Sequence, residues 1–318
     1  MSTQILNVGV DVGGTNMKFG VTDENGNILL QNKKRTYPDR GSDAIVATII
    51  QSVKEMLARG GIDPGQIRSM GLGVPGTTDS RNGVVAFAPN IFWRNVEIVK
   101  AVRRAFDIPV FAVQDTRAAA WAEYLIGAGK GLRSMASVTL GTGIGCGMVF
   151  DGRIFHGGLN TAGEFGHQIV QLDGNPCNCG RHGCLEAYAG GLAIVREARE
   201  HIDGICELLQ KTLPEVAVQD VFNLAQKGNA QARRLTESVV KYLGMGLVNL
   251  INLNSVEFIS ISGGICNAPE ELLLTPLIAF VRSHVYESVA DKVRVCKSQL
   301  GEDAPMIGAA LLYHENPS

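Results

Sequence analysis

Three cysteines within eight residues, Cys177, Cys179 and Cys184, bring several metal-binding side chains into one short segment, 176–186. Clustered thiolates are typical of a zinc site, although the C-x-C-x4-C spacing differs from the common C-x2-C pairs. A cluster of buried free thiols is the alternative that the cysteines by themselves leave open. A carboxylate, Glu186, follows two residues after Cys184, so a metal that fixes this loop also fixes the backbone that carries the carboxylate.

A glycine-rich turn near the N-terminus has the composition of a phosphate-binding loop. Asp11 ends an apolar run, and the turn Gly13-Gly14-Thr15 follows it. Successive backbone N–H groups in such a turn can bind phosphate oxygens, and the threonine hydroxyl adds a donor. Asp11 could hold Mg²⁺ through water, because Mg²⁺ takes one or two carboxylates and keeps several waters. An ordinary β-hairpin turn of type I′ or II′ is the alternative for this loop alone.

A second turn, Gly141-Thr142-Gly143, repeats the pattern of the first. The spacing G-T-x4-G-apolar occurs at 14–21 and again at 141–148, which indicates a weak internal repeat. Two such turns would suit a nucleoside triphosphate held between two lobes, and Gly263-Gly264 could pass close to its nucleoside part. Neither a Walker loop nor a dinucleotide fingerprint fits, because no GxxxxGK[ST] occurs and a strand is predicted after the first turn.

The order of apolar patterns predicts an α/β protein with two similar halves and a ligand cleft between them. Asp115 is placed to be the N-cap of a helix that begins "TRAAAWAEYLIG". We expect residues 1–120 with 304–318 to form a smaller lobe and 121–303 a larger one. Strands are predicted over 5–11, 17–23, 26–35, 67–74, 110–113, 256–264 and 292–297, with a strand, turn and strand from 135, and helices over 43–59, 96–106, 229–252 and from 305.

Composition narrows the class of protein. Lys plus Arg is 29 and Asp plus Glu is 31, a near-neutral balance that does not suit a nucleic-acid-binding protein. No apolar run approaches the roughly 18 residues that a membrane crossing needs, and the N-terminus lacks the pattern of a signal peptide. Seven cysteines, an odd number, suit a reducing compartment better than a disulfide framework. We therefore expect a cytoplasmic protein without nucleic-acid or membrane partners.

Five motifs together identify a family. They are "DVGGTNMKFGV" (11–21), "LGVPG" (72–76), "APNIFW" (88–93), "GTGIGCGMVFDGRIFHGGLNTAGEFGH" (141–167) and "PCNCGRHGCLEAYAG" (176–190). Over nearly its full length the chain resembles the ROK family of sugar kinases, most closely the bacterial ROK glucokinases. The resemblance implies a two-lobed actin-like ATPase (ribonuclease H-like) fold with an interlobe cleft. It also implies ATP- and Mg²⁺-dependent phosphorylation of a hexose at the 6-hydroxyl, with glucose the expected substrate, by a homodimer or homotetramer.

The resemblance further implies a role for each site residue. Asp115 would be the general base on the sugar hydroxyl, which agrees with the chemistry of phosphoryl transfer. His167, Cys177, Cys179 and Cys184 would be a closed structural zinc site, with the second nitrogen of His167 facing the sugar. The sugar would contact Gly76, Asn90, Gln114, Asp115, Glu164, His167 and Glu186. ATP and Mg²⁺ would contact Asp11, Gly13, Gly14, Thr15, Asn16, Lys18, Gly141, Thr142, Gly143, Gly263 and Gly264.

Two positions beside Asp115 depart from the family pattern, because Gln114 and Arg117 stand where the family usually has Asn. Gln114 keeps the amide but is one methylene longer, which can change sugar selectivity well beyond tenfold. Allose, mannose, fructose, N-acetylmannosamine and N-acetylglucosamine therefore stay open as substrates. The family also contains sugar-responsive repressors, which carry a helix-turn-helix domain before the first motif. Here the first motif begins at residue 11, so we expect no room for such a domain. A sugar-binding ATPase without transfer activity is a third possibility.

Overall fold

The computed structural model describes residues 5–315 of the 318-residue chain, which divides into two compact units. Unit 1 comprises Met1–Arg133, Gly147–Gly163 and Gln299–Ser318, and unit 2 comprises Ser134–Cys146 and Glu164–Ser298. The boundary predicted at residue 120 falls within helix α3 (Asp115–Leu125), all of which belongs to unit 1. The chain therefore passes between the units several times.

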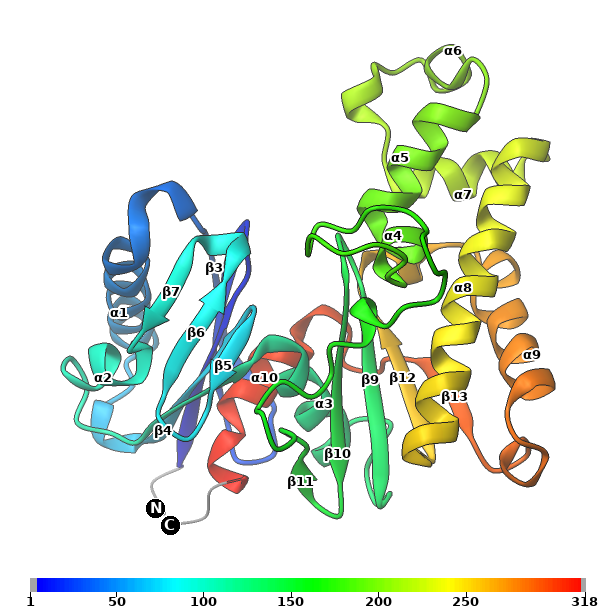
Figure 1. Cartoon of the computed structure of the whole chain (residues 1–318). Coiled ribbons are helices and arrows are strands. Elements are labelled where there is room, and N and C mark those ends of the chain that lie inside the picture. Colours follow the sequence, from blue (N-terminus) through cyan, green and yellow to red (C-terminus); the bar gives the residue numbers. More distant parts are fainter. Residues whose placement is uncertain (1–4, 316–318) are drawn as a thin grey trace. The chain divides into compact units, whose positions relative to one another are not determined.

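Unit 1 is built on a five-stranded sheet of order β3-β2-β1-β4-β8. Figure 1 labels two of its strands, β3 and β4. Its strands are β1 (Leu6–Val12), β2 (Asn16–Thr22), β3 (Ile28–Arg35), β4 (Ile67–Val74) and β8 (Val110–Gln114). β1, β2 and β3 pair antiparallel, whereas β1, β4 and β8 are parallel. The predicted strands in this half of the chain are confirmed. Parallel pairing brings the carboxyl ends of β1, β4 and β8 to one edge of the sheet.

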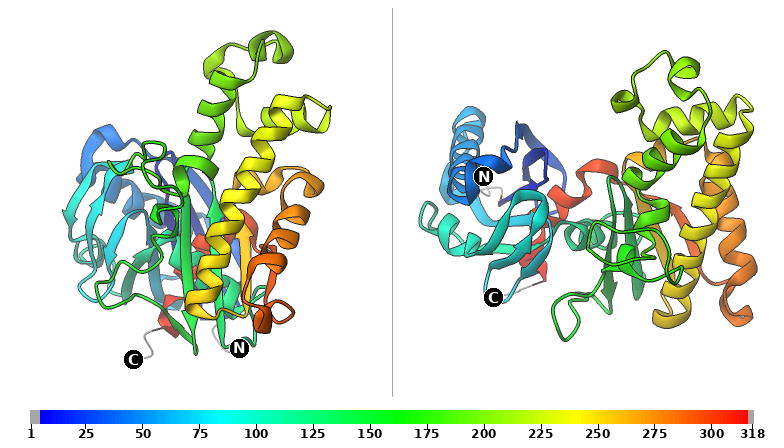
Figure 2. Two further views of the ribbon diagram at one scale, coloured as in Figure 1. Left: turned by 45° about the vertical axis from the view of Figure 1, so that its right-hand side comes forward. Right: turned by 45° about the horizontal axis from the view of Figure 1, so that its top comes forward.

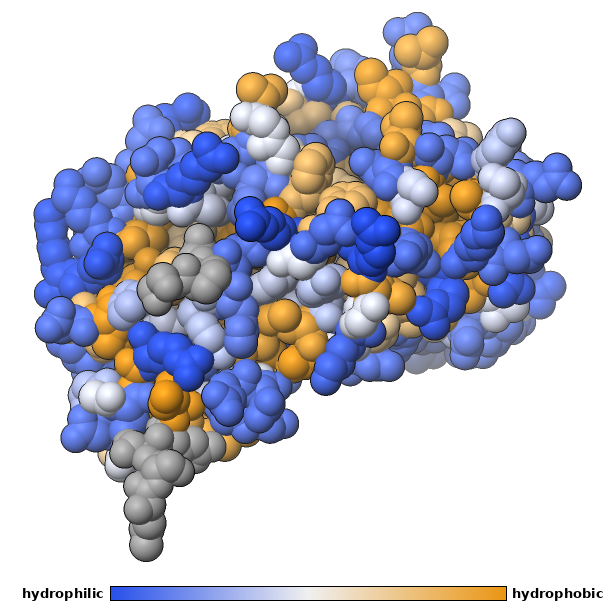
Figure 3. Space-filling view, turned by 90° about the horizontal axis from the view of Figure 1, so that it is seen from below, coloured by the Kyte–Doolittle hydropathy of each residue, from blue (hydrophilic) through white to orange (hydrophobic). Residues whose placement is uncertain are grey.

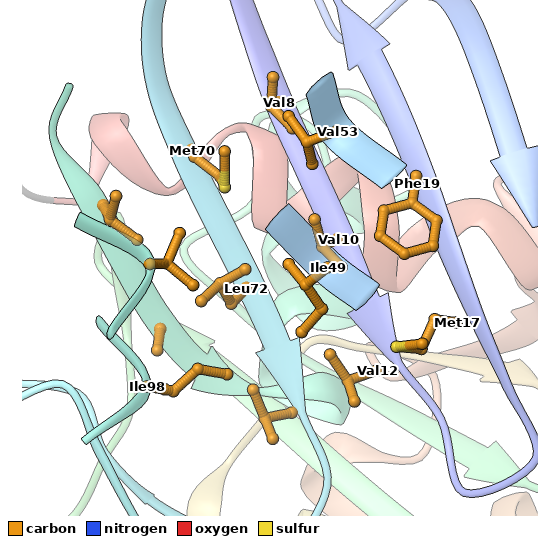
Figure 4. Packing of buried hydrophobic residues seen from close by; sticks show 14 of the residues in the cluster. Val8, Val10, Val12, Met17, Phe19, Ile49, Val53, Met70, Leu72 and Ile98 are labelled. Carbon is orange, nitrogen blue, oxygen red and sulfur yellow. The ribbon is translucent and has the colours of Figure 1, made fainter. Parts of the chain in front are cut away.

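One face of this sheet packs against helix α1 (Gly41–Gly60), which confirms the helix predicted over 43–59. Figure 4 shows Val8, Val10 and Val12 of β1 lying beside Ile49 and Val53 of the helix. All five side chains are fully buried. Each contributes on the order of 1.5–3 kcal/mol relative to leaving it exposed, so this layer fixes the strands that carry the site.

The opposite face is lined by glycines rather than by large side chains. Gly20, Gly9 and Gly71 are register neighbours on β2, β1 and β4. A methyl group on Gly9 or Gly71 would collide with backbone of helix α10 (Ala304–Ala310), so the glycines let this helix lie directly on the sheet. This contact explains why helix α10 belongs to unit 1.

A small sheet and a short helix follow β4. The sheet consists of β5 (Thr77–Asp79), β6 (Val84–Ala88) and β7 (Trp93–Val96), which pair antiparallel, and helix α2 (Ile98–Arg103) follows it. The sequence pattern predicts a helix over 96–106 and no strands here. The prediction was too long because Val96 completes β7, and the strands were missed because runs of three to five residues carry little periodicity.

A second five-stranded sheet has the order β11-β10-β9-β12-β13. Its strands are β9 (Ser134–Leu140), β10 (Ile144–Phe150), β11 (Arg153–Ile154), β12 (Phe258–Ser262) and β13 (Arg294–Lys297). β12 is parallel to both β9 and β13, whereas β10 and β11 are antiparallel. Both five-stranded sheets are thus mixed, which confirms the α/β class.

The helices of unit 2 are α4 (Glu186–Ala189), α5 (Gly191–His201), α6 (Ile205–Leu209), α7 (Val218–Gln226), α8 (Ala230–Asn254) and α9 (Leu274–His284). Helix α8 confirms the long helix predicted over 229–252. Its N-cap Asn229 accepts a hydrogen bond from the Ala232 amide at 2.9 Å. Both views of Figure 2 show α8 and α9 lying side by side.

A helix that crosses a membrane must be both long and apolar. Among residues 5–315, none of the helices combines the length and the apolar character that a membrane crossing requires. On the face seen in Figure 3, hydrophobic side chains are interspersed among hydrophilic ones.

Candidate functional site

Two aspartates of unit 1 lie at the edge where its parallel strands end. Asp11 is the register neighbour of Gly73 on β4, and Gly73 in turn is the neighbour of Val113 on β8. A methyl group on Gly73 would lie only 3.5 Å from the Asp115 Cα. Because the intervening position has no side chain, nothing there separates the carboxylate of Asp11 from that of Asp115.

The electrostatics of this pair are unusual. Burial raises the pKa of Asp11 from its ordinary 3.8 to about 7. The value of about 7 also includes the negative charge of Asp115, which raises the pKa, and the Lys18 ammonium, which lowers it. A divalent cation would relieve the repulsion between two such carboxylates, so the residues present fit the Mg²⁺ that the family implies.

The raised pKa makes a prediction for stability. Folded Asp11 holds its proton up to about pH 7 and the unfolded residue loses it near 3.8, so the wild type loses stability as pH rises through this window. Asp11→Asn has no such charge, so its free energy of unfolding relative to the wild type should rise by about 4 kcal/mol between pH 4 and pH 8. Urea unfolding in metal-free buffer at both pH values measures this. An equal difference at both values would contradict the raised pKa.

Lys18 is the register neighbour of Asp11 on β2, and its ammonium group forms hydrogen bonds within unit 1. Its Nζ donates to the Glu302 carbonyl oxygen at 2.8 Å, and lies 3.3 Å from carboxylate oxygens of Glu302 and Asp303. These contacts hold the segment that leads into α10. The predicted contact of Lys18 with a phosphate stays a prediction.

The first glycine turn closes the hairpin between β1 and β2. The Gly13 amide donates to the Asn16 carbonyl at 3.0 Å, and the Thr36 side chain donates to the Gly13 carbonyl at 2.8 Å. Thr15 is exposed at the tip. A methyl group on Gly14 would lie 3.6 Å from Asn90 Cβ, so the structure brings Asn90 beside this turn.

Gly76 follows the end of β4, and Gln114 is the last residue of β8. Gly76 has φ +82 and its missing side chain would collide with the Phe87 carbonyl, so this position between β4 and β5 requires glycine. Gln114 ends β8 and is 8% exposed, and its Oε1 has no hydrogen-bond partner within residues 5–315. A buried oxygen without a donor costs about 1–3 kcal/mol, which a donor from a bound ligand would recover.

The prediction that Asp115 is the N-cap of its helix is wrong by one position. Gln114 is the N-cap of α3 and Asp115 is its first residue. Asp115 Oδ1 accepts a hydrogen bond from the Thr116 amide at 2.7 Å. The β-strand conformation extends through Gln114, because this residue still pairs with Val74 of β4.

The second glycine turn, in unit 2, is held by the start of helix α5. The carbonyls of Gly141 and Thr142 accept hydrogen bonds from the Gly191 and Leu192 amides at 2.9 and 3.1 Å. Gly263 has φ +96, and a methyl group on it would collide with the Leu140 carbonyl. The predicted nucleotide-binding segments 141–143 and 263–264 are therefore neighbours within unit 2.

Glu186 lies against the second turn, and no pattern in the sequence predicts this contact. Its Oε2 accepts a hydrogen bond from the Ile144 amide at 2.8 Å. A methyl group on Gly143 would overlap this carboxylate, so glycine at 143 leaves room for it. The structure thus joins a residue assigned to the sugar with a turn assigned to the nucleotide.

The cysteine cluster has the geometry of a zinc site. The ligand atoms of His167, Cys177, Cys179 and Cys184 all lie within 4.8 Å of one another. Cys177 Sγ is 3.7 Å from His167 Nδ1, and the sulfurs of Cys179 and Cys184 are 3.7 Å apart. Tetrahedral zinc with Zn–S bonds of about 2.3 Å places two thiolates ~3.8 Å apart. The predicted Cys₃His set therefore fits zinc.

The loop around the cluster is a small hairpin. The Cys177 amide donates to the Arg181 carbonyl at 2.8 Å, and the Leu185 amide donates to the Gln168 carbonyl at 2.9 Å. His182 is exposed opposite Pro176 and lies outside the cluster. Helix α4 begins with Glu186 directly after this hairpin, so the cluster and the carboxylate lie on one continuous segment.

The two nitrogens of His167 point to different groups. Nδ1 lies toward Cys177, and Nε2 lies 4.0 Å from Glu164 Oε2. Metal-binding histidines commonly offer their second nitrogen to such an outer partner. The cluster therefore orients His167 toward Glu164, another residue assigned to the sugar.

Comparison with known proteins places this arrangement in a family. The family model described as "ROK family" matches residues 7–316. The glucokinase of Thermotoga maritima is 34% identical over 97% of both chains, and the xylose repressor of Bacillus spizizenii is 27% identical over 97% of this chain and 77% of the repressor. A crystal structure of a ROK family glucokinase from Streptomyces griseus in complex with glucose and AMPPNP superposes with a TM-score of 0.81 at 32% identity, covering 96% of this chain and 98% of that one. The predicted fold class is thereby confirmed, and the protein belongs to the ROK family.

Proposed function

We propose that this protein is an ATP- and Mg²⁺-dependent sugar kinase that transfers the γ-phosphoryl group of ATP to the 6-hydroxyl of a hexose, with glucose as the expected substrate. The observation that carries the proposal is the pair Asp11 and Asp115 at one edge of the unit 1 sheet. A carboxylate with a pKa raised to about 7 beside a second carboxylate suits a cation and a general base. The similarity to glucokinases over the whole chain supports the same activity.

Asp115 is the general base in this proposal. It accepts the proton of the 6-hydroxyl as the sugar oxygen attacks the γ-phosphorus and the bond to ADP breaks. Asp115 lies in the first turn of α3, at the end of β8. Asp11 would hold Mg²⁺ through water, and bound Mg²⁺ would neutralise the phosphate charge.

The remaining residues bind the two substrates. The turns at 13–15 and 141–143, with Asn16 and Lys18, bind the phosphates, and Gly263-Gly264 lies along the nucleoside. Gly76, Asn90, Gln114, Glu164, His167 and Glu186 bind the sugar hydroxyls. Carboxylates accept paired hydrogen bonds from neighbouring hydroxyls, and amides both donate and accept, so these residue types suit a sugar.

Zinc has a structural role in this account. Four protein ligands fill a tetrahedral site and leave no position for a reactive water. The metal would hold the hairpin between His167 and Glu186 so that both side chains keep their orientation. Assembly into a homodimer or homotetramer stays a prediction of the family resemblance. The cytoplasmic location also stays a prediction.

Two alternatives are separable by one assay. Xylose repressors are also similar to this chain, and a sugar-binding ATPase would use the same nucleotide turns. We expect ADP release to require a hexose, with glucose the best of a panel that includes mannose, allose, fructose, N-acetylglucosamine and N-acetylmannosamine. ADP release at the same rate without sugar would indicate an ATPase, and no ADP release with any sugar would favour a sugar-sensing role.

Gln114 should select among hexoses. Its buried Oε1 needs a donor, and shortening the side chain by one methylene in Gln114→Asn moves that acceptor away from the hydroxyl it meets. We expect the ratio of kcat/KM between the best two hexoses to change by about tenfold or more. An unchanged ranking and ratio would remove Gln114 from selection.

A further inference from the structure

Arg117 is a buried cation two residues after the proposed base. Arg117 is only 1% exposed, although arginine side chains are rarely buried. Its Nη2 donates to the carbonyls of Asn160 and Ala162 at 3.0 and 2.8 Å. Its Nη1 lies 3.4 Å from both Asn160 Oδ1 and His156 Nδ1. One guanidinium therefore binds three residues of a single segment, 155–163.

This 155–163 segment has few other anchors. Asn160 has φ +59 and its Nδ2 donates to the Thr78 carbonyl at 2.9 Å. The Ala162 amide donates to the His156 carbonyl at 3.1 Å, which closes the segment into a loop. Leu159 at its tip is 87% exposed, so packing contributes little there. Polar contacts hold the segment to the rest of unit 1. Arg117 makes several of them, and others are the Asn160 contact with Thr78 and a hydrogen bond from the Phe155 amide to the Met148 carbonyl at 2.8 Å.

His156 is adapted to this arrangement. Burial, together with the positive charges of Arg117 and Arg81, lowers the pKa of its imidazole from 6.5 to about 4. A neutral imidazole can accept a hydrogen bond from the guanidinium through Nδ1, whereas a charged one would be repelled. The contact between the two side chains therefore persists at neutral pH.

The segment leads directly into the residues assigned to the sugar. Gly163 is the last residue of unit 1 in this part of the chain, and Glu164 is the first of unit 2. His167 follows three residues later. Arg117 thus fixes the chain immediately before Glu164, while the zinc cluster fixes it immediately after, at His167.

We propose that Arg117 is a positioning residue that holds the 155–163 segment ordered, and so sets the affinity for the hexose rather than the rate of transfer. The inference rests on the proposed kinase function. If the segment is mobile in the free enzyme, binding must supply the free energy that orders Glu164, and KM rises. Lysine cannot replace the contact fully, because only a planar guanidinium binds two carbonyls with fixed geometry.

The test compares Arg117→Met and Arg117→Lys with the wild type. We expect Arg117→Met to raise the KM for the hexose by about tenfold or more, with kcat and the KM for ATP within about threefold. Arg117→Lys should fall between. Amide hydrogen exchange should quicken in 155–163 and stay unchanged in α3. Arg133→Met is the control, because Arg133 also lies at a boundary between the units but pairs with Asp151 in an exposed position.

Asn160→Gly is the second variant, for use if Arg117→Met fails to fold. It keeps the positive φ and removes the side-chain contacts of Asn160, so it weakens the same anchor. It should raise the KM for the hexose in the same direction. A fall in kcat without a change in KM would overturn the proposal, since it would mean that Arg117 acts on helix α3 and Asp115. Faster exchange in 155–163 with unchanged kinetics would overturn it too. A wild type that phosphorylates no hexose would instead refute the kinase function itself.

Discussion

Asp115→Asn should lower kcat by at least about 10²-fold, because asparagine cannot accept the proton that the attacking hydroxyl loses. Asparagine has nearly the same shape, and its Oδ1 can still accept the hydrogen bond from the Thr116 amide. Helix α3 should therefore keep its start, and glucose should still bind. Steady-state kinetics with calorimetric measurement of glucose binding checks both expectations.

The same variant should be more stable than the wild type above neutral pH. Asp115 contributes to the raised pKa of Asp11, so removing its charge lowers that pKa and relieves repulsion in the folded state. An inactive but more stable enzyme would separate a catalytic role from a folding defect. Asp107→Asn, an exposed aspartate of the same unit, is the matched control and should change neither property. Turnover near that of the wild type in Asp115→Asn would remove Asp115 from the role of base.

Cys179→Ser should abolish zinc binding and destabilise unit 2 by at least about 5 kcal/mol, because the free energy of binding structural zinc is part of the free energy of folding. Cys179 is exposed, so its replacement leaves no cavity, and a loss of stability reports on the metal. Zinc content by mass spectrometry and urea unfolding monitored at Tyr188 and Tyr242, whose stacked rings lie 4.2 Å apart, check the result.

Cys206→Ser provides the control for the thiol itself. Cys206 lies in α6, also in unit 2, and outside the metal cluster. This variant should keep one zinc per chain and full stability. A metal-free Cys179→Ser protein with wild-type activity and stability would refute the structural role of zinc and favour a cluster of ordinary thiols.

Much of the fold could be predicted because its elements are locally encoded. Helix α1 has apolar residues at helical spacing, and β1 and β4 are apolar runs bounded by glycine. The ligand set of the zinc cluster was also predictable, since its three cysteines and His167 lie within eighteen residues. In each case the signal and the structure involve neighbouring parts of the chain.

The contacts that the sequence did not reveal join distant segments. Lys18 binds Glu302 and Asp303 because α10 packs on the glycine row of β1, β2 and β4. Glu186 binds the Ile144 amide because α4 follows the zinc hairpin beside the second turn. No local pattern encodes such pairs, since they depend on how the sheets and helices pack. Arg117 shows this most clearly, because a lone arginine in an alanine-rich helix has no visible partner in sequence.

The most direct test of the account is the product of the wild-type enzyme with ATP, Mg²⁺ and glucose. Phosphorus NMR should show a sugar 6-phosphate resonance growing at the rate at which ADP appears, one for one. Asp115→Asn under the same conditions should form neither. Release of inorganic phosphate in place of a sugar phosphate, or no turnover with glucose or any other hexose, would contradict the proposed kinase.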